Sequence, residues 1–173
     1  MKIKKIAIIL LIGSIITILF IYFFLKKDEY VTNKDINFLI VSSYSNYAEE
    51  PHFNGTAIAD NGNIYTWNEI GHDNTKKYKI GTVEGLQKYI LKEAKIKNKK
   101  ASSDDLNKLK DYITNLEDKI TLKYPGADQG TSTISVIIDG NKEITLKSTG
   151  DVIGKNKTKE AQKIIKIIDK YLQ

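Results

Sequence analysis

The sequence predicts an α+β fold, with an N-terminal transmembrane helix followed by one domain. In that domain we expect an antiparallel sheet, made of two hairpins and a further strand, packed by about three helices. Three observations predict this: an uncharged run at residues 6–25, two Gly-containing turns between apolar runs, and three stretches with helical spacing of apolar residues. The predicted order is strand, hairpin, two helices, hairpin and helix, which favours helices backing an antiparallel sheet.

Residues 6–25 have the length and composition of a membrane anchor. A helix of that length, at about 1.5 Å per residue, spans roughly 30 Å, which is the thickness of the hydrocarbon core of a bilayer. The run is longer than the apolar core of a signal peptide and no small-x-small cleavage site follows it. An uncleaved anchor is therefore favoured, and a cleaved signal peptide, which would give a secreted protein, and a buried core helix are the alternatives.

The lysines around the run predict its orientation. Three lysines precede it and two follow it, so the positive-inside rule favours a cytoplasmic N-terminus. Residues 1–5 are then cytoplasmic, 26–34 form a polar tether, and 35–173 form an extracytoplasmic domain. The expected location is the cell membrane, with a single span.

The net charge of +6 does not indicate nucleic-acid binding. Five of the 27 basic residues flank the anchor, and from residue 28 onward 22 lysines face 21 acidic residues, a net charge of +1. All the basic residues are lysine, which together with abundant Ile and Asn favours a bacterial protein from an AT-rich genome. The absence of cysteine excludes disulfides, thiolate catalysis and Cys-ligated zinc.

The first half of the domain predicts a strand and a hairpin. The β-branched and aromatic residues 36–44 predict a strand, and 45–54 a loop. Residues 56–59 and 64–67 alternate around an Asn-Gly turn, a strong hairpin signal because Gly tolerates positive φ. We expect residues 71–81 to form a polar loop.

Two helices are predicted next. Thr82 caps the first, which runs to about Lys97. Ser102 opens the second with a capping-box-like start, and we expect Pro125-Gly126 to end it. Its apolar residues step by three and four positions, at Leu106, Leu109, Ile113, Leu116 and Ile120.

The chain closes with a second hairpin and a third helix. The hairpin pairs 132–138 with 143–147 around Asp139-Gly140-Asn141, and a loop at 148–156 leads to a helix after Thr158. The two hairpins resemble each other in sequence. Either an internal duplication or independent use of the same turn chemistry explains this, and we favour the turn chemistry.

No motif predicts a metal, a cofactor or a catalytic group. His52 and His72 are the only histidines and lack metal-binding spacing, so we interpret both as solvated loop residues. The Asp-rich turns lack the frame of an EF-hand. Nucleophile motifs are absent, so we nominate no catalytic residue and regard an enzyme as less favoured. The alternative is an envelope hydrolase with an unrecognised carboxylate pair, drawn from Glu49, Glu50, Glu69, Asp128 and Asp151.

The best binding signal is the stretch 76–100, with nine lysines and two glutamates. It predicts attraction to an anionic polymer or an envelope protein, although a solvated helix face is the favoured explanation. The aromatic residues at 44–67 fit either a recognition surface or, preferably, core packing. The candidate binding residues are Lys92, Lys95, Lys99, His72, Asp73, Tyr47 and Trp67. The predicted function is a membrane-anchored, extracytoplasmic binding module of a bacterial envelope, without catalysis and without a nucleic-acid partner.

Overall fold

The computed structural model describes residues 36–46, 51–126 and 130–172. The predicted cytoplasmic N-terminus, anchor and tether lie outside these ranges, and so does Tyr47. Within them, no helix combines the length and the apolar composition that a membrane crossing requires.

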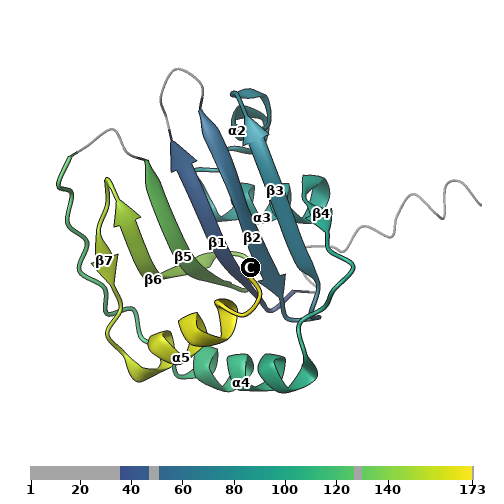
Figure 1. The fold of residues 1–173 in the computed structure, drawn as a ribbon, viewed down its shortest axis with the longest axis vertical. Helices are drawn as coiled ribbons and strands as arrows, with labels where there is room; N and C mark the ends of the chain where they lie inside the picture. The colour runs from purple at the N-terminus through teal and green to yellow at the C-terminus, as the bar shows by residue number, and fades with distance from the viewer. Residues whose placement is uncertain (1–35, 47–50, 127–129, 173) are drawn as a thin grey trace, which may run out of the picture. The chain divides into compact units, whose positions relative to one another are not determined.

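The described residues form one seven-stranded antiparallel sheet and four helices (Figure 1). The strand order β4-β3-β2-β1-β5-β6-β7 places β1 at the centre, between the hairpins β2-β3 and β5-β6. This confirms the α+β class. The strands are β1 Phe38–Asn46, β2 His52–Ala59, β3 Ile64–Ile70, β4 Lys95–Ile96, β5 Thr131–Ile138, β6 Lys142–Gly150 and β7 Gly154–Lys155. The helices are α2 Asp73–Tyr78, α3 Val83–Glu93, α4 Ser103–Thr114 and α5 Lys159–Ile168.

The first four residues of β1 are buried on both faces of the sheet. Phe38 and Ile40 point toward α4 and α5, whereas Leu39 and Val41 point toward α3. A strand covered on both faces has a continuous apolar sequence instead of an alternating one, which explains the run at this position.

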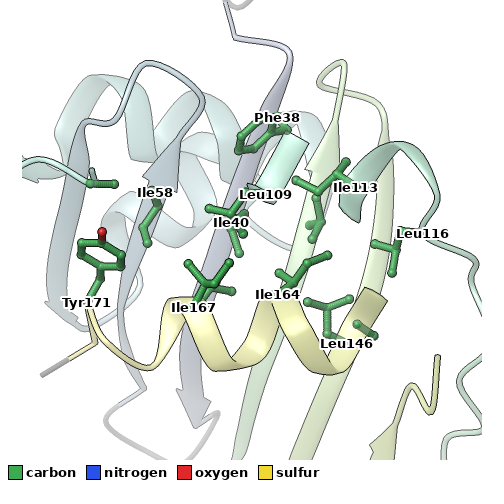
Figure 2. Packing of buried hydrophobic residues seen from close by; sticks show 14 of the residues in the cluster. Phe38, Ile40, Ile58, Leu109, Ile113, Leu116, Leu146, Ile164, Ile167 and Tyr171 are labelled. Atoms are coloured by element: carbon green, nitrogen blue, oxygen red, sulfur yellow. The ribbon is translucent and has the colours of Figure 1, made fainter. Parts of the chain in front are cut away.

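Helices α4 and α5 cover one face of the sheet, which we call the α4/α5 face (Figure 2). The side chains of Leu109, Ile164 and Ile40 are each at most 1% exposed there, and burial of such a side chain contributes about 1.5–3 kcal/mol. Both helices begin at the predicted caps, because Ser102 accepts a hydrogen bond from the Asp105 amide and Thr158 from the Ala161 amide.

The other face, the α3 face, is covered by α3 over an aromatic cluster. The ring centres of Phe53 and Trp67 are 5.5 Å apart, and those of Trp67 and Tyr89 are 6.3 Å apart with the rings edge to face. The indole lies against Gly55, its partner on β2: a Cβ at Gly55 would stand 2.4 Å from the Trp67 ring. Glycine is therefore required beneath the tryptophan.

Strands β1 and β2 are both longer than predicted. Strand β1 extends to Asn46 and β2 starts at His52, which pair directly, so the prediction of a loop throughout 45–54 is wrong. His52 consequently lies in a strand and not in a loop. Polar residues extend these strands because cross-strand pairing outweighs their weak intrinsic preference for β structure.

The segments before and after the first predicted helix also differ from the prediction. Residues 71–81 contain the short helix α2, so the loop prediction there is wrong. Helix α3 starts after the predicted cap Thr82 but ends at Glu93 and not near Lys97. Lys95 and Ile96 pair with β3 instead, which requires extended backbone from Ala94 onward.

Helix α4 ends at Thr114, so the prediction that it continues to Pro125-Gly126 is wrong. After the helix the chain runs beside β7, where the side-chain amide of Asn156 donates to the Glu117 carbonyl and Lys123 forms a β-bridge with Ile153. These contacts stabilise a non-helical path despite the helical spacing of the apolar residues. The predicted loop at 148–156 likewise contains the end of β6 and all of β7.

Candidate functional site

The clearest charged hollow in the described residues is the lysine pocket, an open space of about 490 Å³ between α2 and α3. Its lining residues are Lys77, Tyr78, Lys79, Thr82, Glu84, Gly85, Lys88 and Lys92. It combines four ammonium groups with one lining carboxylate, so its charge favours an anion.

Local sequence explains how the lysine pocket forms. Glu84, Lys88 and Lys92 are spaced by four residues and share one side of α3. The Thr82 hydroxyl caps α3 by accepting from the Gly85 amide at 3.1 Å, and it donates to the Lys79 carbonyl at 2.9 Å. A Cβ at Gly85 would stand 2.3 Å from that carbonyl oxygen, so only glycine allows α3 to approach the end of α2 this closely.

One side of the pocket is held by Glu93. Its carboxylate accepts a hydrogen bond from the Tyr78 hydroxyl and pairs with the Lys77 ammonium at 3.1 Å. The pKa of Glu93 is lowered by the hydrogen bond from Tyr78 and then by the one from Lys77. The Lys77 ammonium also lies 4.7 Å from the centre of the Tyr78 ring. Glu93 therefore holds the side chains of Lys77 and Tyr78 in place at one wall of the pocket.

The structure separates the three lysines that the sequence nominated. Lys92 lines the lysine pocket, but Lys95 lies in β4 and lines a different hollow together with Glu69 and Glu93. The Lys99 ammonium is 5.8 Å from the centre of the Tyr171 ring, beyond the end of α5. Lys77, Lys79 and Lys88 were missed as individual residues, although the spacing of Lys88 and Lys92 was a usable signal.

The other nominated residues do not join this site. His72 is the exposed N-cap residue of α2 and its carbonyl accepts from the Lys76 amide, while Asp73 is the first residue of the same helix. Trp67 is only 7% exposed and belongs to the aromatic cluster, which agrees with core packing as the favoured interpretation.

Two of the carboxylates considered for hydrolysis lie far apart. Glu69 accepts from the Tyr89 hydroxyl at 2.9 Å, and burial followed by this bond raises the pKa of Tyr89. Asp151 accepts from the Gly130 amide at 2.9 Å, next to the end of β6. Three strands separate β3 from β6, a distance of roughly 20 Å, whereas glycosidase carboxylates stand about 5–9.5 Å apart.

Metal ligands do not converge either. In the parts of the chain that the structure describes, no three His, Cys, Asp or Glu side chains come close enough to hold an ion. The Asp60 carboxylate of the first turn instead accepts from the backbone and side-chain amides of Asn37, at 2.9 and 2.8 Å. This contact fastens the turn to the start of β1.

A second surface, the polar grid, lies on the α4/α5 face beyond the reach of its helices (Figure 1). Three rows of directly paired residues cross β1, β2 and β3. The rows are Ser42-Thr56-Thr66, Tyr44-Asn54-Asn68 and Asn46-His52-Ile70. The sequence did not predict this surface, although polar residues at every second position of both β2 and β3 were a usable signal.

Two surfaces therefore remain as candidates, the lysine pocket and the polar grid. Each presents polar or charged side chains at the surface, and the sheet lies between them. No protein-family model, no curated protein and no solved structure matches this chain. The chemistry of the two surfaces is therefore the guide to what each could bind.

Proposed function

We propose that the protein is a membrane-anchored, extracytoplasmic binding module of a bacterial cell envelope, without catalytic activity, and that its ligand is an anionic polymer. We infer the class of ligand from the lysine pocket. The uncharged run at residues 6–25 supports the anchor.

The chemistry of lysine favours a flexible, phosphate-bearing polymer over a small anion of fixed geometry. An ammonium acts as a mobile point charge, whereas planar bidentate recognition requires arginine, which this chain lacks. An open pocket lined by lysines, of which Lys77 is paired with Glu93, can follow a chain of phosphates. Because the lysine side chains that line the pocket are largely exposed, salt should weaken the attraction, with a Debye length of about 10 Å at 0.1 M.

The test is binding of poly(glycerol phosphate) to the full chain in detergent micelles, at two salt concentrations. A double substitution, Lys88→Gln with Lys92→Gln, should weaken binding about tenfold to thirtyfold, at about 1 kcal/mol for each lysine. The matched control is Lys155→Gln with Lys157→Gln, which removes the same charge from exposed positions near β7. Equal effects of the two pairs, or binding that salt does not weaken, would remove the lysine pocket as the site.

The placement is tested separately by single cysteines, since the natural chain has none. On intact cells, Lys157→Cys should react with a membrane-impermeant thiol reagent, while Lys4→Cys should react only after lysis. The reverse pattern would contradict the proposed topology.

A further inference from the structure

One lysine of the lysine pocket, Lys77, is already held by a carboxylate of the same chain. A single oxygen of Glu93, Oε1, accepts hydrogen bonds from the Lys77 ammonium at 3.1 Å and from the Tyr78 hydroxyl. An anion that enters the pocket therefore meets Lys77 with its charge already balanced.

The pair between Lys77 and Glu93 is easily exchanged. Their side chains are 61% and 33% exposed, and an ion pair this open to water contributes little to stability. Glu93 is also the last residue of α3, where the partial negative charge of the helix end opposes a carboxylate. A second anion can therefore replace Glu93 at Lys77 at little cost.

A phosphate polymer has contacts that Glu93 lacks. The pocket that Lys77 lines is also lined by Lys79, Lys88 and Lys92, so a polymer can meet several ammonium groups at once. The charge of Lys92 also stabilises the ionised form of Glu93, so the competition extends to a second lysine. The polymer offsets the exchange at Lys77 through its contacts with the neighbouring lysines.

Release of Glu93 leaves no buried unpaired charge. Glu93 does not line the lysine pocket but lines a second hollow, together with Glu69 and Lys95. The Glu69 carboxylate there accepts from the Tyr89 hydroxyl, and Lys95 supplies an ammonium group to the same hollow. A released Glu93 carboxylate thus stays hydrated in a hollow that contains a positive charge, and the desolvation penalty of a buried ion does not apply.

We propose that Glu93 is an internal competitor for the ligand of the lysine pocket: it neutralises Lys77 in the free protein, and a phosphate group of the ligand displaces it on binding. This inference rests on the proposed function, because it concerns the same pocket and the same class of ligand. Its effect is selectivity for ligands of high charge. A ligand must meet several lysines at once to offset the exchange, so an anion with a single charge binds poorly.

The test is a double-mutant cycle, measured by poly(glycerol phosphate) binding to the full chain in detergent micelles. The natural chain is compared with Lys77→Gln, Glu93→Gln and the double variant. Glutamine keeps the size of the side chain and can still accept from Tyr78, so Glu93→Gln removes the charge without removing that contact. We expect Glu93→Gln to raise affinity about threefold to tenfold, as the release of one lysine predicts. Lys77→Gln should lower affinity less than about twofold in the natural chain but about fivefold in the Glu93→Gln chain.

The matched control is Glu84→Gln, which removes the same charge from the carboxylate that lines the pocket itself. In the Glu84→Gln chain, Lys77→Gln should again lower affinity less than about twofold, because Glu93 still holds Lys77. A fivefold loss there as well would mean that only the total charge of the pocket matters, and would overturn the proposal.

The affinity of Glu93→Gln gives the second decision. Reduced affinity would mean that Glu93 positions Lys77 for the ligand, and unchanged affinity would mean that it does not compete, so either result overturns the inference. If Lys88→Gln with Lys92→Gln weakens binding while Glu93→Gln does not strengthen it, the inference fails and the proposed function stands. Binding by Glu93→Gln but not by the natural chain would support the competitor and contradict the proposed function. Absence of binding in both would contradict both proposals.

Discussion

Two ends of the same sheet face differ in one respect: helices cover only one of them. Ile40, Ile58 and Ile64 form a row across β1, β2 and β3, and each is 1% exposed beneath the α4/α5 layer. The next row, two residues along each strand, is Ser42, Thr56 and Thr66, and none of the helices that the structure describes lies over it (Figure 1). The change from apolar to polar therefore occurs within a single row, at the limit of helical cover.

The comparison shows that a polar surface can belong to a well-packed part of a sheet. The polar grid shares its strands with the aromatic cluster on the α3 face, so its polarity does not reflect poor packing. Residues in the covered rows should determine stability, and residues in the open rows should contribute little to it. Five substitutions test this difference.

The largest effect is expected in the covered end. Ile164→Ala removes a fully buried side chain of α5 and should lower the free energy of unfolding by about 2–5 kcal/mol, because it leaves a cavity. Asn68→Ala in the polar grid should change it by less than about 0.5 kcal/mol. Urea denaturation measures both, and similar losses would contradict the proposed division between the two ends.

Asp105, which is 7% exposed, links the two helices that cover this end, α4 and α5. Its carboxylate accepts from the Tyr171 hydroxyl at 2.7 Å and pairs with the Lys170 ammonium at 3.1 Å, joining the start of α4 to the end of α5. Asp105→Asn should cost about 1–3 kcal/mol at neutral pH.

This cost should depend on pH. The hydrogen bond from Tyr171, and then that from Lys170, holds the pKa of Asp105 below its usual range. A lowered folded-state pKa contributes stability above the unfolded-state value of about 3.9, and that contribution is lost as the pH falls through the folded-state pKa. The difference between the natural protein and Asp105→Asn should be constant from pH 7 to about 5 and shrink below about pH 4. Thermal melts across this range measure the difference. A difference that stays constant below pH 4 would contradict the contribution of the ionised Asp105 carboxylate to stability.

A smaller effect is expected behind the polar grid. Gly55→Ala places a Cβ 2.4 Å from both the Trp67 ring and the Ser42 carbonyl oxygen, so the indole must move. We expect a loss of about 1–3 kcal/mol and a shift in tryptophan emission, which reports on Trp67 alone because the chain has a single tryptophan. Unchanged emission would mean that the strand moves and the aromatic cluster stays intact.

The smallest effect on stability is expected from Thr56→Val. Thr56 lies in the first open row, and the substitution keeps its shape while removing the hydroxyl. The free energy of unfolding should change by less than about 0.5 kcal/mol, as measured by urea denaturation. A large loss of stability would contradict the prediction, because it would mean that Thr56 contributes to stability as the residues of the covered rows do.

Much of the fold could be predicted because it depends on local chemistry. The caps Thr82, Ser102 and Thr158 and both hairpin turns lie where the sequence predicts them. Three of the errors share one cause: at 45–54, 94–97 and 148–156, strand pairing that the local sequence pattern does not indicate decided the conformation. The explanation of the resemblance between the two hairpins by turn chemistry, in preference to an internal duplication, stays a prediction.

The sequence by itself determined the uncharged run, the α+β class and the basic stretch at 76–100, because composition and short-range periodicity encode them. Only the tertiary structure decided which lysines share a pocket. Lys92, Lys95 and Lys99 are close in sequence but lie on a helix, a strand and a loop that face different surroundings. The polar grid likewise exists only once β1, β2 and β3 pair in register. Cross-strand pairing, which no local pattern fixes, brings its nine side chains onto one face.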